Sequence, residues 1–182
     1  SVPQLGWVAA GLGLLCMFYA GTLPTEINPL QAALRSYWRS IHVPPLLFSY
    51  GLFTIAGISS AARLLIKQPT QTAPGSWLSH PHLYDEVTYR CIAAGFPLLM
   101  IGVILGAVWA NEAWGNYWSW DPKESMSLVT LLGYGIYLHL RINGTPSAST
   151  LAWVSIGGFL LVLMTFLGVN MWGDRKSTRL NS

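Results

Sequence analysis

Long apolar runs, interrupted by very few charges, limit what this chain can fold into. Of its 182 residues, 52% are hydrophobic and only 9% are charged, whereas an ordinary soluble domain carries about a quarter charged residues. About 20 consecutive apolar residues cross a bilayer as one α-helix, which satisfies its own backbone hydrogen bonds. The sequence therefore predicts an all-α, polytopic integral membrane helix bundle. The net charge of +3 comes without a basic cluster, so no nucleic-acid partner is expected.

Five apolar segments predict about five transmembrane helices. Their expected ranges are 5–23, 43–65, 91–110, 124–140 and 150–172. The second is expected to begin at Pro44-Pro45, because proline is tolerated at a helix start, where its missing N–H has no partner. In the third, Gly102 and Gly106 have the small-xxx-small spacing that lets membrane helices pack closely. This spacing supports a helix bundle and says little about function.

The connection between the third and fourth segments, residues 109–124, is the most unusual part of the chain. It reads Trp-Ala-Asn-Glu-Ala-Trp-Gly-Asn-Tyr-Trp-Ser-Trp-Asp-Pro-Lys-Glu. Trp and Tyr collect at membrane surfaces, because their rings are apolar and their N–H or O–H groups hydrogen-bond water. An aromatic belt of this kind, at the membrane–water interface, accounts for one or two of these rings. Four indoles and a phenol together predict a platform for a large, flat, apolar ligand.

The end of this connection has the pattern of a helix start. Asp121 is expected to be the N-cap, Pro122 the first helical residue and Glu124 the third, which is the arrangement of a capping box. A structural role for Asp121 and Glu124 is therefore at least as well supported as a chemical one.

The basic residues give a weak indication of orientation. Those on one side of the predicted membrane are Arg63, Lys67, Arg90 and Arg141, and those on the side of the tryptophan loop are Arg35, Arg39 and Lys123. The positive-inside rule places the richer side in the cytoplasm. The tryptophan loop is therefore predicted to face outward.

Haem is a flat ligand that such a platform would suit, and its iron takes axial imidazoles. Two histidines of the chain are candidates for binding this iron. His42 precedes the second span on the side of the tryptophan loop, a position equally consistent with a solvated residue and with a ligand. His139 follows Glu124 by 15 residues, about 22 Å along a helix, which places it in the inner part of the membrane. Ionisable residues there are costly to bury and usually functional, although one near a helix end can also reach the aqueous side.

A longer motif connects these features to a known family. The pattern Trp-Gly-x-Tyr-Trp-x-Trp-Asp-Pro-Lys-Glu at residues 114–124 resembles the signature of the tryptophan-rich (WWD) haem-handling proteins of cytochrome c-type biogenesis. Within them the chain is most similar to the CcsA/ResC type, the haem-presenting subunit of a two-component cytochrome c synthase. Further similar segments are residues 35–43, 107–113, 137–141 and 166–170. The resemblance thus covers most of residues 30–172.

The resemblance implies roles for particular residues. The implied outward haem platform consists of Trp109, Trp114, Tyr117, Trp118, Trp120 and Asp121. His42 matches an outward axial ligand of the haem iron, and His139 matches the intramembrane ligand on the haem entry path. The family also has a second outward histidine after its Gly-Val-Asn motif, where this chain reads Met171-Trp172-Gly173. Met126 stands where the family pattern has Trp.

The implied function is haem transport and presentation for covalent attachment to apocytochrome c. The implied ligand is haem b, and the implied partners are a CcsB/ResB-type membrane subunit and an apocytochrome with a Cys-x-x-Cys-His motif. No nucleophile or general base is evident, so the contribution to a haem–cytochrome c synthase (lyase) would be positioning and redox control. The expected location is the bacterial cytoplasmic (inner) membrane, with the thylakoid membrane as the alternative.

Two other functions are consistent with the same residues. A CcmC-like shuttle delivers haem to a chaperone without forming thioether bonds. A structural or quinone-binding membrane subunit would use the tryptophans only as an interfacial belt.

The last nine residues, 174–182, differ in composition from the rest of the chain. They read Asp-Arg-Lys-Ser-Thr-Arg-Leu-Asn-Ser and resemble the translation of a common sequencing-adapter oligonucleotide. Residues 1–173 are therefore expected to form one membrane haem-handling domain, truncated at both ends, and residues 174–182 a non-native tail.

Overall fold

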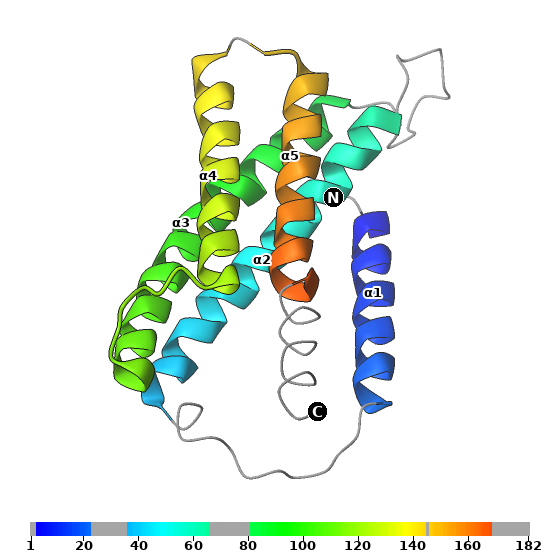
Figure 1. Cartoon of the computed structure of the whole chain (residues 1–182). Coiled ribbons are helices and arrows are strands. Elements are labelled where there is room, and N and C mark those ends of the chain that lie inside the picture. The colour runs from blue at the N-terminus through cyan, green and yellow to red at the C-terminus, as the bar shows by residue number, and fades with distance from the viewer. Residues whose placement is uncertain (1–2, 23–35, 66–80, 145, 169–182) are drawn as a thin grey trace, which may run out of the picture.

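The computed structural model describes residues 3–22, 36–65, 81–144 and 146–168 (Figure 1). The helices are α1 (Pro3–Gly21), α2 (Tyr37–Leu65), α3 (Pro81–Trp114), α4 (Pro122–Asn143) and α5 (Ala148–Leu163), and α5 continues as the π-helical segment η3 (Met164–Gly168). No strand occurs in these ranges, so the predicted all-α class is confirmed. The predicted tail, residues 174–182, and the position expected for a second outward histidine lie outside the described residues.

Each predicted span corresponds to one helix. By length and composition, three of the helices in the described ranges can cross a membrane: Tyr37–Leu65, Pro81–Trp114 and Ala148–Leu167. The membrane helix bundle is therefore confirmed. The number of five crossings stays a prediction.

Three predicted helix boundaries were wrong. α2 begins at Tyr37, so Pro44 and Pro45 lie inside the helix and not at its start. Contacts with α3 link this first part of α2 to the bundle: the Ser36 hydroxyl, just before the helix, donates to a Glu112 carboxylate oxygen at 3.0 Å. α3 begins at Pro81, well before the predicted start at residue 91. It also continues to Trp114, so the tryptophan-rich connection is helical in its first part and shorter than predicted.

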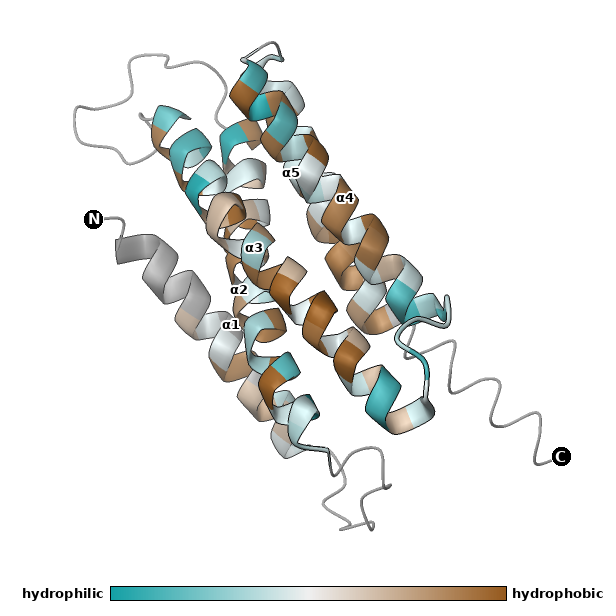
Figure 2. Cartoon of the chain, turned by 90° about the vertical axis from the view of Figure 1, so that its left-hand side faces the viewer, coloured by the Kyte–Doolittle hydropathy of each residue, from teal (hydrophilic) through white to brown (hydrophobic). Residues whose placement is uncertain are grey.

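The helices α2, α3, α4 and α5 pack side by side with alternating directions (Figures 1 and 2). The start of α2, the end of α3, the start of α4 and η3 therefore meet at one end of the bundle, drawn at the bottom of Figure 1. This end, residues 36–43, 106–127 and 164–168, is called the platform end below. The opposite end contains residues 59–65, 81–90 and 139–151.

The core lies where α2 crosses α3 beneath α4 and α5. Its buried residues are Phe53, Ala56, Ile92, Leu99, Tyr134, Tyr137, Leu151 and Val162. The Phe53 and Tyr134 rings stack with centroids 3.7 Å apart. Glycines make room for both rings, because a Cβ atom on Gly95 would lie 2.8 Å from Phe53 Cε1 and one on Gly158 2.9 Å from Tyr134 Cε1.

The outer surface of the helices is apolar in the middle and polar at the ends. In Figure 2 hydrophobic residues dominate the middle of α3, and hydrophilic residues gather near the helix ends. Large apolar side chains such as Ile104, Leu132 and Leu160 are exposed on three different helices. This distribution is the one that a lipid environment requires.

Ion pairs hold the opposite end together. The Arg63 Nε atom lies 3.2 Å from the Asp85 carboxylate between α2 and α3. Glu86 is paired twice, with Arg90 at 2.7 Å on its own helix and with Arg141 at 3.9 Å from α4. Every basic residue described at this end therefore has a carboxylate partner.

Candidate functional site

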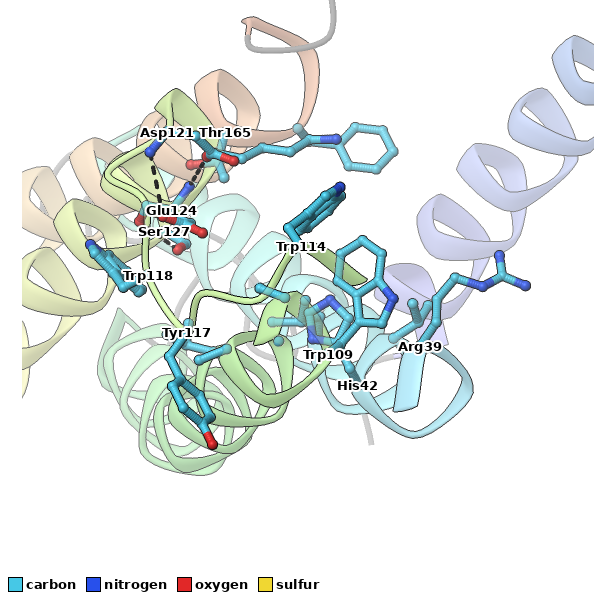
Figure 3. Close-up of a pocket in the computed structure, with 18 of the residues that line it drawn as sticks. Arg39, His42, Trp109, Trp114, Tyr117, Trp118, Asp121, Glu124, Ser127 and Thr165 are labelled. Atoms are coloured by element: carbon cyan, nitrogen blue, oxygen red, sulfur yellow. Dashed lines mark hydrogen bonds between the residues drawn. The ribbon is translucent and has the colours of Figure 1, made fainter. Parts of the chain in front are cut away.

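A cavity of about 450 Å³ lies at the platform end, enclosed by α2, α3, the start of α4 and η3 (Figure 3). This volume is within the range of small-molecule sites, about 300–1,000 Å³. The predicted site residues that line the cavity are His42, Trp109, Trp114, Tyr117, Trp118 and Asp121. Much of the remaining lining is aliphatic, including Val43, Leu46 and Val103. The fold thus brings six of the eight predicted site residues to one apolar cavity.

His42 is held in a defined orientation by α3. Its Nδ1 atom lies 2.8 Å from the backbone carbonyl oxygen of Gly102. A carbonyl oxygen only accepts, so Nδ1 carries the proton, and in a neutral ring Nε2 then carries the lone pair. No hydrogen bond to Nε2 is present in the described part of the chain. A ring fixed through one nitrogen, with the other nitrogen free of hydrogen bonds, is the arrangement typical of metal-binding histidines.

The two glycines of the small-xxx-small spacing create the space for this ring. A Cβ atom on Gly106 would lie 2.8 Å from His42 Cε1 and 2.9 Å from Nδ1. One on Gly102 would lie 2.7 Å from Leu46 Cγ, one turn further along α2. A larger residue at either position would force the His42 ring or the Leu46 side chain to shift. The glycines therefore set both the helix packing and the position of His42.

The aromatic rings follow His42 along α3 and into the loop. Trp109 stacks on the His42 ring, with centroids 5.9 Å apart and planes 13° apart. Trp114 meets Trp109 edge to face at 4.8 Å. Trp114 and Tyr117 are each 60% exposed, so their apolar faces are open to a ligand. Figure 3 shows Trp109 and Trp114 beside His42, with Tyr117 and Trp118 on the other side.

Trp118 and Trp120 differ from each other although both belong to the predicted platform. Trp118 is half-buried, lines the cavity and has a buried Nε1 atom without a hydrogen-bond partner among the described residues. Trp120 is 70% exposed and does not line the cavity. Its ring meets Trp118 edge to face at 5.8 Å. Trp120 therefore supports the platform from outside.

The loop that carries these rings is short and anchored at both ends. Gly115 has φ +79° and ends α3, with its N–H donating to the Asn111 carbonyl at 2.8 Å, because glycine adopts a left-handed backbone without a steric cost. At the other end, the predicted capping box is confirmed. The Glu124 N–H donates to Asp121 Oδ1 at 2.7 Å, and Glu124 Oε2 accepts from the Asp121 N–H at 3.4 Å.

Glu124 also holds the middle of the loop. Its Oε2 atom accepts from the backbone N–H of Ser119 at 2.7 Å and from the Ser119 hydroxyl at 3.2 Å. Between these anchors Trp120 adopts φ 58°, a left-handed conformation that costs a non-glycine residue about 1–3 kcal/mol. The Ser125 hydroxyl donates to the Trp120 carbonyl at 3.3 Å. Side chains of α4 therefore hold the loop in a conformation that the backbone alone disfavours.

His139 lies far from this site. It is in the last turn of α4, at the opposite end of the bundle, and it is exposed. Its Nε2 atom lies 2.9 Å from Asn143 Nδ2, and an amide nitrogen donates, so Nε2 accepts that hydrogen bond. The structure thus separates the two predicted histidine ligands. The intramembrane position and ligand role of His139 stay predictions.

The sequence reasoning missed how four residues relate to the site. The spacing of Gly102 and Gly106 indicates close helix packing, but it does not indicate that the space is occupied by the His42 ring and Leu46. Arg39 and Lys123, which line the cavity, were considered only for membrane orientation. In the described ranges no cluster of three or more His, Cys, Asp or Glu side chains could hold a metal ion.

The fold and the site define a polytopic α-helical membrane protein with an aromatic cavity at one end, to which the described residues contribute one imidazole. The profile of the family described as cytochrome c assembly protein matches residues 3–175. The chain belongs to this family.

Curated relatives support the predicted CcsA type. The cytochrome c biogenesis protein CcsA of Chlamydomonas reinhardtii is 40% identical over 175 residues, which cover 94% of this chain and 50% of the relative. CcsA of Synechococcus sp. (strain RCC307) is 35% identical, covering 94% of this chain and 64% of the relative. CcsA of Prochlorococcus marinus (strain MIT 9312) is 36% identical, covering 95% and 65%. The chain therefore spans about half to two thirds of the length of these relatives. No solved structure matches it.

Proposed function

We propose that this chain presents haem at the outer surface of a membrane for covalent attachment to apocytochrome c. The observation that carries the proposal is the orientation of His42. Its Nδ1–H is bound to the Gly102 carbonyl at 2.8 Å, and its ring lies in a cavity lined by Trp109, Trp114 and Trp118. Membership of the cytochrome c assembly family supports the same function.

The residues of the cavity fit haem b. Haem is a flat apolar macrocycle whose iron takes axial imidazoles. In this reading His42 Nε2 binds the iron from one side, and Trp114, Tyr117 and Trp118 contact the macrocycle through ring faces and edges. The exposed half of these rings leaves one part of the ligand accessible to a partner protein.

The chemical contribution of the chain is positioning. In thioether formation each cysteine S–H of the apocytochrome adds across a haem vinyl C=C bond, with sulfur bonding to one carbon and hydrogen to the other. That addition requires no protein nucleophile. It requires the vinyl group and the thiol to be held together, which lowers the entropic part of the barrier. His42 and the tryptophans hold one reactant, and an apocytochrome with a Cys-x-x-Cys-His motif supplies the other.

The proposed route begins at the other end of the chain. Haem enters at His139, with a second ligand from a CcsB/ResB-type membrane subunit, and moves to the platform end. The membrane is the bacterial cytoplasmic membrane, with the platform end facing outward. Relatives from an alga and from cyanobacteria support the thylakoid membrane as the alternative.

The test is to remove the imidazole of His42. In the complete gene product, purified from membranes in detergent, His42→Ala is expected to lower the haem-to-protein ratio about tenfold or more, as for loss of a metal ligand or its support. Added imidazole is expected to restore part of the haem-to-protein ratio, because a free imidazole ring can occupy the vacated space and bind the iron. The matched control is His82→Ala, which removes an exposed histidine from the start of α3 at the opposite end.

The outcome also separates the alternatives. If His42→Ala leaves both the haem spectrum and its occupancy unchanged, His42 is not the ligand and the proposal fails. If the wild-type protein contains no haem at all, a structural or quinone-binding membrane subunit becomes the better reading. If it loads haem but supports no thioether formation with its partner, a CcmC-like shuttle is favoured.

A further inference from the structure

Basic side chains differ in their ion-pair partners between the two ends of the bundle. At the opposite end, Arg63, Arg90 and Arg141 each pair with a carboxylate. At the platform end, the described basic residues are Arg39 and Lys123, and both line the cavity. No ion pair of either one with a described carboxylate is present.

Arg39 belongs to the same face of α2 as His42, which follows it by three residues. Its Nε atom is buried and has no hydrogen-bond partner among the described residues. Arg39 is among the residues that line the cavity, and Figure 3 shows it beside His42 and Trp109, with its guanidinium group directed outward from these rings. A buried cationic N–H without a partner is costly in a region of low polarity. An anion close to this N–H would satisfy it.

Lys123 lies in the first turn of α4, between two carboxylates that are already engaged. Asp121 Oδ1 accepts from the Glu124 N–H at 2.7 Å. Glu124 Oε2 accepts from the Ser119 N–H, the Ser119 hydroxyl and the Asp121 N–H. These carboxylates stabilise the loop and the start of α4. Lys123 lines the cavity together with Asp121 and Glu124, and its ammonium group forms no ion pair with a described carboxylate.

We propose that Arg39 and Lys123 form an anion subsite that binds the two propionate carboxylates of haem. The inference rests on the proposed function and adds to it an orientation of the ligand. Haem b carries its propionates on two adjacent pyrrole rings and its vinyl groups on the other two. With the propionates bound by these cations, the vinyl groups point away from them, toward the part of the site that a thiol partner must reach.

The test compares haem with its dimethyl ester, which has the same macrocycle and iron but no carboxylate charge. The complete gene product, purified in detergent from haem-starved cells, is titrated with each compound and followed by absorption. Wild-type protein is expected to bind haem about tenfold or more tightly than the ester, because the ester cannot form the charged hydrogen bonds that carboxylates form with Arg39 and Lys123. This preference is expected to shrink as salt is added.

Two variants assign the preference to the two cations. Arg39→Gln and Lys123→Gln are each expected to weaken haem binding several-fold and to leave ester binding unchanged. Arg39→Lys keeps the charge and is expected to retain most of the preference. The matched control is Arg90→Gln, which removes an exposed basic residue at the opposite end and is expected to change neither affinity.

The outcomes distinguish the subsite from the proposed function. If wild-type protein binds haem and the ester equally, the subsite is absent while the proposed function stands. An Arg39→Gln or Lys123→Gln protein that keeps the full preference also overturns the assignment. If neither compound binds, the proposed function itself fails. Lys123 is exposed, so its variant still decides the question if Arg39→Gln does not fold.

Discussion

The two ends of the bundle each place a histidine on a helix, yet the two imidazoles are held in opposite ways. His42 donates its Nδ1–H to Gly102 on a neighbouring helix, and its Nε2 has no hydrogen-bond partner among the described residues. His139 uses its Nε2 to accept from Asn143, one turn further along its own helix. In His42 the contact between helices uses Nδ1 and leaves Nε2 without a hydrogen bond. In His139 the contact within the helix uses Nε2 itself. His139 must give up the Asn143 contact before Nε2 can bind iron.

The largest expected effect tests whether the two histidines act in sequence. If haem passes His139 before reaching the platform, His139→Ala should deplete haem at both positions. Replacing Trp114, Trp118 and Trp120 together by Ala should deplete only the platform position, since the inner site contains none of these rings. Haem-to-protein ratios and absorption spectra of both variants, purified with the partner subunit, decide the order.

Two results would contradict this sequence of sites. Equal loss of haem in both variants would indicate a single shared site. Full loading of the platform in the His139→Ala protein would show that haem arrives by another route.

The next largest effect concerns the contact that orients His42. Gly106→Ala places a Cβ atom 2.8 Å from the His42 ring, so the ring must shift and its hydrogen bond to Gly102 is lost. We expect haem affinity to fall about tenfold or more, as for other lost supports of a metal ligand, and stability to fall by about 1–3 kcal/mol from overpacking. Haem titration and thermal unfolding in detergent measure the two changes.

The matched control is Gly157→Ala on α5, where a Cβ atom would meet nothing within 4 Å. That variant is expected to bind haem normally. If Gly106→Ala binds haem as tightly as the control, the contact with α3 does not position His42.

A smaller effect is expected from the loop anchor. Glu124→Ala removes the acceptor shared by Ser119 and Asp121, and we expect a loss of stability of about 1–2 kcal/mol, as for a helix cap and a charged hydrogen bond. Ser119→Ala removes only the hydroxyl donor and should cost less. Unfolding measurements on the two proteins test this order, and a larger loss for Ser119→Ala would refute the central role of Glu124.

The smallest effect is expected at the opposite end. Arg63→Gln breaks the ion pair with Asp85, whose side chains are 22% and 19% exposed. The expected loss of stability is about 1 kcal/mol or less, with unchanged haem occupancy. A double-mutant cycle with Asp85→Asn measures the pair itself. Loss of haem in the Arg63 variant would mean that the two ends are coupled.

Sequence patterns predicted the features that depend on interactions between residues close together in the chain. The apolar runs predicted the helices, and Asp121, Pro122 and Glu124 predicted the capping box, because each depends on residues within a few positions of one another. The start of α2 at Tyr37 could not be predicted in this way, because the contacts of this part of the chain with α3 join residues far apart in the sequence.

The arrangement of the site needed the structure for a similar reason. His42 and Gly102 are 60 residues apart in the sequence, and only the register of α2 against α3 brings them together. Composition predicts that Trp120 belongs to the platform, but in the structure its backbone is left-handed and its ring does not line the cavity. Arg39 and Lys123 enter the sequence analysis as charges near the membrane surface, and the sequence does not indicate that both line the cavity.

The clustering of indoles also gives the molecule an optical property. Of its nine tryptophans, Trp38, Trp109, Trp114, Trp118 and Trp120 lie at the platform end, and Trp153 lies towards the other end of the bundle on α5. Much of the intrinsic fluorescence therefore originates beside the cavity. The near-ultraviolet absorption of haem overlaps tryptophan emission, so a haem held there accepts the excitation energy of these rings. The emission intensity of the protein thus reports, in real time and without a label, whether the cavity is loaded.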